Sequence, residues 1–137
     1  MFIRIEPSSA MPIYRQIMDQ IRYQIAAGVL KEGDKVPSVR QMAADLAVNQ
    51  NTILKVYNEL CREDVLRVER GSGTVVAGGG TQAIPMAERK RSVGALLREA
   101  AVQAIHMGLS ADQTRQLLER EYAAIQADQH KNRSEKP

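Results

Sequence analysis

The sequence is poor in aromatic residues, in cysteine and in long apolar runs. Aromatic residues make up 4% of the chain and there is no tryptophan, so the core must be aliphatic. Cys61 is the only cysteine, which excludes a disulfide within the chain. No segment approaches the ~18 apolar residues that would cross a membrane, and the N-terminus lacks the apolar run of a signal peptide. We therefore expect a cytoplasmic protein.

Residues suited to metal binding or catalysis are also missing. His106 and His130 are far apart, with no cysteine or carboxylate at metal-ligand spacing. No serine, histidine and aspartate form the grouping typical of nucleophilic catalysis. Gly71-Ser72-Gly73 precedes a predicted strand, whereas a phosphate-binding loop opens a helix with Gly-Lys-Ser/Thr. The sequence therefore predicts a protein that is not an enzyme and needs no metal or cofactor.

The chain has no strong excess of charge of either sign. Its net charge is +3, and residues 1–78 hold ten Lys and Arg against nine Asp and Glu. Any nucleic-acid surface must therefore come from the local placement of a few cations.

The first half of the chain begins with an extended segment and two helices. Residues 2–5 favour β structure, and a helix is predicted over residues 12–27, where isoleucine recurs every four positions. A second helix is predicted over residues 38–46. Ser38 stands three residues before Gln41, which is capping-box spacing and marks the start of that helix.

A third helix and a hairpin complete the pattern. After a turn at Ala47-Val48, the helix is predicted to begin near Asn49. Its apolar residues share one face: Ile53, Val56, Tyr57 and Leu60. The opposite face is predicted to carry Asn51, Leu54, Lys55 and Asn58. Short strands follow at 65–68 and 74–76, around a turn with two glycines. The order predicts an α+β fold, a winged helix-turn-helix whose third helix fits the DNA major groove.

The glycine run that follows is typical of a linker. We predict four parts: a DNA-binding domain at 1–77, a linker at 78–81, a helical dimerisation region at 82–127 and a polar tail at 128–137. The helical region is predicted to contain one helix over 86–107 and another starting at Ser110. From Asp128 the tail is expected to fray.

The two C-terminal helices are predicted to form a homodimer. About 45 residues are too few to bury two apolar faces and remain stable alone. A second copy is the simplest cover, with these residues inside the resulting bundle: Leu96, Leu97, Ala100, Ala104, Leu117, Leu118 and Ile125. Two-fold symmetry would then match an inverted-repeat operator.

Polar residues around the third helix are the candidates for contacting DNA. Amide side chains bind base edges, whereas cations bind phosphates. Arg40 opposes the dipole of its own helix, which suggests an anionic partner. The candidate DNA-binding residues are Ser38, Arg40, Asn49, Gln50, Asn51, Thr52, Lys55, Arg70 and Gly73. Leu54 is suited to a thymine methyl group. For Asn49, capping of the helix is an equally good interpretation.

These motifs together resemble the GntR family of bacterial transcription regulators. The resemblance covers about residues 10–77 and rests on Pro12-Ile13-Tyr14, Val36-Pro37-Ser38-Val39-Arg40, Asn51-Thr52 and Gly71-Ser72-Gly73-Thr74. It implies operator contacts for Arg40, for the residues from Asn49 to Thr52 and for Gly73. Many members carry Arg or Lys where Gln50 and Leu54 stand here, so the base preference of the half-site is expected to differ.

The short C-terminal part is similar to the YtrA subfamily, which implies repression of a transporter operon. We expect any small-molecule effector to bind between domains or between subunits. A winged helix used only for protein–protein contact is the alternative. The polar Asn-Gln-Asn-Thr sequence favours DNA over such an interface, whose core is typically rich in aromatic residues.

Overall fold

The protein divides into two compact units, Met1–Ile84 and Pro85–Pro137. The structure, a computed structural model, describes residues 1–78 and 82–134, and side chains as far as residue 128. Of the predicted linker, only Gly78 lies within the described residues. It adopts a φ of +80°, a left-handed conformation that glycine accepts without strain.

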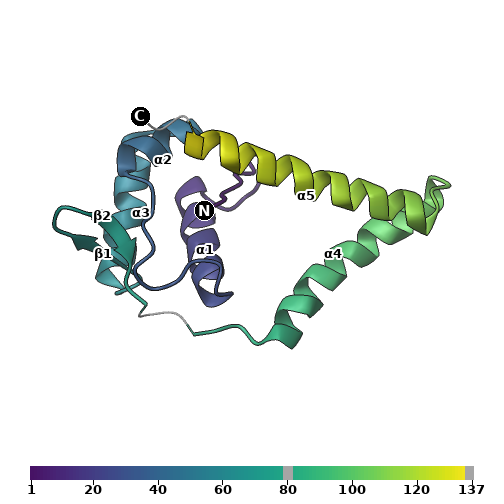
Figure 1. Cartoon of the computed structure of the whole chain (residues 1–137), viewed down its shortest axis with the longest axis horizontal. Helices are drawn as coiled ribbons and strands as arrows, with labels where there is room; N and C mark the ends of the chain where they lie inside the picture. The colour runs from purple at the N-terminus through teal and green to yellow at the C-terminus, as the bar shows by residue number, and fades with distance from the viewer. Residues whose placement is uncertain (79–81, 135–137) are drawn as a thin grey trace. The chain divides into compact units, whose positions relative to one another are not determined.

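The described part of the first unit is a winged helix-turn-helix, as predicted (Figure 1). Its strands pair antiparallel, from Leu66↔Val76 to Glu69↔Gly73. The elements are α1 (Ile13–Ala26), α2 (Val39–Leu46), α3 (Gln50–Arg62), β1 (Leu66–Glu69) and β2 (Gly73–Val76). The bounds of α1 and α2 and the start of α3 lie within a residue of the predicted ones.

The core of this unit is aliphatic, as the composition predicts. From α1, Ile17 and Ile21 are fully buried, whereas Ile13 at the start of the helix is 38% exposed. The four residues predicted to share one face of α3 are all buried: Ile53, Val56, Tyr57 and Leu60. Burying a Leu- or Ile-sized side chain contributes about 1.5–3 kcal/mol, so this face fixes the rotation of α3 about its axis.

The segment before α1 forms no strand, although its sequence favours β structure. Three glutamines on α1 take the place of a neighbouring strand. Gln20 Oε1 accepts from Arg4 N at 2.8 Å, and its Nε2 donates to Arg4 O at 2.6 Å. Gln24 and Gln16 bind Phe2 and Glu6 in the same two-bond manner. The alternation turns Ile3 and Ile5 towards the core.

The turn between α2 and α3 is closed by backbone hydrogen bonds. Ser38 Oγ accepts from Gln41 N at 3.1 Å and caps α2. The Gln41 side chain donates to Asp45 and does not return to Ser38, so only half of the predicted capping box forms. Ala47 ends the helix with a left-handed φ of 53°, and Val48 N donates to Ala43 O at 3.0 Å.

The wing depends on glycine at its tip. Gly71 and Gly73 have φ of +83° and +86°, and no atom lies within 4 Å of a Cβ placed on either residue. Backbone conformation, and not crowding, therefore requires glycine at these positions. A β-bridge between Lys35 and Val75 ties the hairpin to the segment before α2, with backbone hydrogen bonds such as the one from Val36 N to Thr74 O at 3.0 Å.

The second unit is a pair of helices, α4 (Met86–His106) and α5 (Ala111–Ser134). Ser110 and Gln113 form a full reciprocal capping box at the start of α5. The helix continues to Ser134, beyond Asp128, where the sequence predicts fraying. Among the described helices, none combines the length and the apolarity that crossing a membrane would take.

The two helices leave most of their apolar surface uncovered. Ala104 is the only buried residue among the described side chains of this unit. Six of the seven residues predicted to lie inside a dimer are exposed in the single chain: Leu96, Leu97, Ala100, Leu117, Leu118 and Ile125. The hairpin therefore has no apolar interior of its own within the described residues.

Candidate nucleic-acid interface

The start of α3 presents short polar side chains to solvent. Asn49 Oδ1 accepts from Asn51 N at 2.8 Å, so Asn49 caps the helix, one of the two roles proposed for it. Its amide nitrogen remains a potential donor. Gln50 and Asn51 are exposed, and Thr52 is half-buried. The cap leaves the Asn51 side chain available for other contacts.

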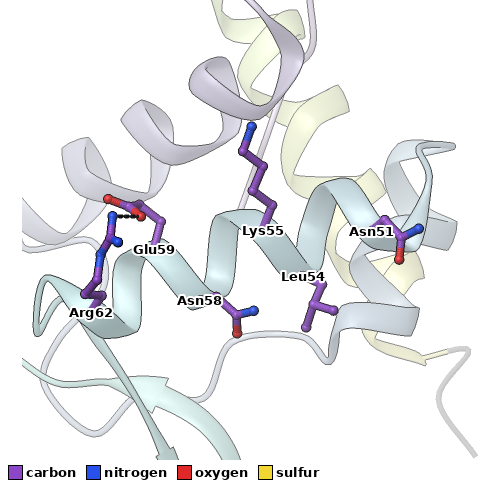
Figure 2. Close-up of a pocket in the computed structure, with 6 residues that line it drawn as sticks. All are labelled: Asn51, Leu54, Lys55, Asn58, Glu59 and Arg62. Atoms are coloured by element: carbon purple, nitrogen blue, oxygen red, sulfur yellow. Dashed lines mark hydrogen bonds and ion pairs between the residues drawn. The ribbon is translucent and has the colours of Figure 1, made fainter.

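The exposed face of α3 continues along the helix from Asn51. Figure 2 shows Leu54 and Asn58 pointing to the same side of α3. A shallow, open depression runs along α3 next to this face, and its lining also includes Asn51 and three residues at the border of the face, Lys55, Glu59 and Arg62. Leu54 is 46% exposed, an apolar side chain among polar neighbours. Asn58 was not singled out from the sequence as a contact residue, although its spacing from Asn51 placed it on this face.

Lys55 points away from this face and towards α1 (Figure 2). Its Nζ lies 3.9 Å from the centroid of the Tyr14 ring, a cation–π contact. If Lys55 binds a DNA phosphate, as predicted, it would therefore do so from the side of α3 that faces α1. Arg62, at the C-terminal end of α3, pairs with Glu59 and neutralises it.

Arg40 and the N-terminus of α2 together form a positively charged part of the surface. Arg40 is exposed and has no ion-pair partner among the residues that the structure describes. The first turn of α2 contains no acidic residue. Its free N–H groups and the helix dipole favour an anion, as the guanidinium of Arg40 does.

The Tyr57 side chain links α3 to Pro37, the residue before the cap of α2. Its hydroxyl donates to Pro37 O at 2.6 Å, so the start of α2 is held against α3. Burial, with a smaller contribution from the negative charge of Asp45, raises the pKa of this hydroxyl. The group therefore stays protonated and keeps donating. The sequence placed Tyr57 among apolar residues and gave no signal for this bond.

The wing tip also carries an exposed cation. Arg70 is exposed and forms no ion pair within the described part of the chain. Arg67, on β1, is used differently, since it donates to Val76 O at 3.3 Å and pairs with Glu69. Of the two wing arginines, Arg70 is thus the one whose charge is available to a partner.

The described side chains give little support for a metal site or for a reactive cysteine. No group of three or more His, Cys, Asp or Glu among them could hold a metal ion. Cys61 is half-buried, and burial raises the pKa of its thiol. The thiol is therefore less reactive than a free cysteine.

Comparisons with known proteins agree on one family. The model described as "Bacterial regulatory proteins, gntR family" matches residues 13–76. The chain is 44% identical over 75 residues to the HTH-type transcriptional repressor YtrA of Bacillus subtilis. That match covers 55% of this chain and 58% of the Bacillus protein, so the chain spans little more than half of this relative.

Two solved structures match nearly the whole chain. One is YtrA from Sulfolobus acidocaldarius, a GntR-family transcription factor. It is 35% identical with a TM-score of 0.52, over 90% of this chain and 99% of that one. The other is a transcriptional antiterminator from Listeria monocytogenes. It is 30% identical with a TM-score of 0.54, over 91% and 92% of the two chains.

The bond from Tyr57 to Pro37 leads to a prediction about stability and pH. Near pH 8, Tyr57→Phe should lower the free energy of unfolding by about 1–2 kcal/mol, because the Pro37 carbonyl loses its buried donor. Above about pH 10 an unfolded tyrosine releases its proton, whereas folded Tyr57 keeps it. The contribution of Tyr57 is therefore full below that pH and is lost as the pH rises.

Urea unfolding of the wild type and Tyr57→Phe at pH 8, 10 and 11 would measure both effects. The wild type should lose stability more steeply than the variant above about pH 10, since the variant lacks the titrating group. The other tyrosines are common to both proteins. Parallel pH profiles would contradict the role assigned to Tyr57.

Proposed function

Because the chain belongs to the GntR family of bacterial regulatory proteins, we propose that it is a repressor that binds an inverted-repeat operator as a homodimer. The family consists of DNA-binding transcription regulators and not of enzymes. The observation that carries the proposal is that the same unit presents the exposed polar start of α3 and two exposed cations, Arg40 and Arg70, which have no ion-pair partner among the described residues.

The division of labour follows from the chemistry of each side chain. Gln50 and Asn51 present amides, which pair with the base edges of adenine in two hydrogen bonds. Arg40, together with the N-terminus of α2, is suited to a phosphate on one side of the helix. Arg70 extends from the wing towards the backbone or the minor groove. Ser38, Thr52 and Gly73 are assigned supporting contacts beside these residues.

Repression is proposed from the relatives. The Bacillus protein is named a transcriptional repressor, and the length of the C-terminal part here resembles that type of regulator. A repressor acts by occupying its operator, which needs only tight and specific binding. We extend the proposal to an operon that encodes a transporter, on the same resemblance.

Dimerisation is proposed through the hairpin of α4 and α5. Leu96 is 67% exposed, Leu97 44% and Leu118 40%. Helical spacing places Leu97, Ala100 and Ala104 on one face of α4, and Leu118 and Ile125 on one face of α5. A second copy of the hairpin would cover both apolar faces in a four-helix arrangement. The symmetry of such a dimer would present two recognition helices to two half-sites.

A small-molecule effector, if the protein responds to one, is not expected to be enclosed by the helical hairpin of a single chain. A ligand pocket typically encloses about 300 Å³ or more, and the described hairpin buries only Ala104. A ligand enclosed by residues 82–127 of one chain would contradict this assignment.

The role of Asn51 is tested by a change at the tip of α3. Asn51→Ala should weaken binding to the cognate operator by about 1–3 kcal/mol, because one base loses a bidentate partner. Binding to random DNA should hardly change. Fluorescence anisotropy on both duplexes measures the two losses, and equal losses would show that Asn51 does not read a base.

The role of Arg40 is tested by salt. Arg40→Ala should weaken binding to all sequences and reduce the slope of log affinity against log salt by about one, because one phosphate contact is removed. Arg4→Ala is the matched control, since Arg4 is exposed and pairs with Glu6 on the N-terminal segment. A slope that falls equally in both variants, or in neither, would reject the phosphate contact.

The dimer is tested by placing charge on its proposed interface. Leu97→Glu with Leu118→Glu should give monomers at micromolar concentration, because two carboxylates per chain would be buried against apolar surface. Residues 1–77 should still fold, and operator binding should weaken strongly. Val29→Glu changes a residue that is 65% exposed on the first unit and should leave the dimer intact. Sedimentation measures the oligomeric state of both variants. A double mutant that stays dimeric would place the dimer interface elsewhere.

A further inference from the structure

Asn58 lies in the middle of the exposed face of α3. It follows Asn51 by seven residues, so at about 100° per residue the two side chains leave the helix within about 20° of each other. Figure 2 shows Asn58 on the same side as Leu54 and away from Lys55. Its side chain is exposed and has no hydrogen-bond partner among the described residues.

Nothing in the fold explains an asparagine at this position. Asn58 is neither at a helix end nor bonded to the local backbone, the two settings in which asparagine stabilises a helix. In the interior of a helix it is less favourable than alanine by about half a kcal/mol. The described contacts of the chain provide no compensating interaction.

The rest of this face lacks a cation aimed at bases. Lys55 is held over Tyr14 on the side of α1, and the charge of Arg62 is shared with Glu59. The commonest specific contact in the major groove, Arg or Lys on guanine, is therefore not available from the middle of α3. What this face offers is two amides, at Asn51 and Asn58, with the exposed methyl groups of Leu54 between them.

We propose that Asn58 reads a second adenine in each half-site, about two to three base pairs from the base read by Asn51. The separation follows from the helix, which rises about 10.5 Å over seven residues, and from the ~3.4 Å rise per base pair of a groove that winds around its axis. Leu54 then meets a thymine methyl between the two adenines. The inference rests on the proposed function, since it requires α3 in the major groove.

The test begins with the wild-type full-length chain and a pool of random duplexes. Repeated selection gives the preferred operator, and each base pair of one half-site is then changed in turn. Affinities for this set are measured for the wild type, Asn58→Ala and Asn51→Ala. Asn51→Ala is the matched control, because it removes the same amide from the same face. Circular dichroism and urea unfolding check that Asn58→Ala remains folded.

The expected result is a different signature for each variant. At one A·T pair, the wild type should prefer adenine over guanine by about five- to 150-fold, and Asn58→Ala by less than about twofold. Asn51→Ala should lose its preference at another pair, two or three positions away, and keep the preference assigned to Asn58.

Three outcomes would overturn the inference. The first is an Asn58→Ala variant that matches the wild type at every base pair. The second is an equal loss of affinity for every sequence, which would make Asn58 a backbone contact. The third is a separation between the pairs coupled to Asn51 and Asn58 of one base pair, or of more than about four, which would contradict the geometry. In each case an operator selected by the wild type still supports the proposed function. A wild type that selects no sequence would overturn the proposed function and this inference together.

Discussion

The burial of one face of α3 is the contact on which the proposed interface depends. Ile53, Val56 and Leu60 are completely buried, and with about 3.6 residues per turn the helix cannot rotate without exposing them. The opposite face is therefore fixed in solvent, where Asn51 and Asn58 lie. The bond from Tyr57 to Pro37 extends the same constraint to the start of α2. Packing in the core thus determines which amides and which cations a DNA duplex would meet.

The small net charge of the chain does not show where on its surface positive charge is available to a partner. Several cations of the first unit are engaged by carboxylates, as Arg22 is by Glu63 and Arg67 is by Glu69. Arg40 and Arg70 are not paired with any described residue, and the N-terminus of α2 adds its dipole to the first of them. A protein with a charge of +3 can therefore present a local positive surface. The ion pairs thus help to determine which cations remain available to bind DNA.

Much of the fold could be predicted from the sequence because its signals are local. Apolar spacing and caps such as Ser38 and Asn49 placed the start of each described helix within a residue of its observed start. Contacts between distant segments could not be read in the same way. The glutamines of α1 bind the backbone of residues 2–6 where the sequence suggested a strand, and Tyr14 turns Lys55 away from its neighbours on the helix. The candidate site was predicted as a set of residue types, and tertiary contacts decide where each side chain points.

The most direct test of the account is capture of genomic DNA fragments by the purified full-length protein, followed by footprinting of the enriched fragments. We expect two protected half-sites related by two-fold symmetry, with centres one helical turn or a multiple of it apart, about 10–10.5 base pairs per turn. Both half-sites should lie over or beside a promoter. A single protected half-site would contradict the dimer, and the absence of any enriched sequence would contradict the central claim that α3 reads DNA.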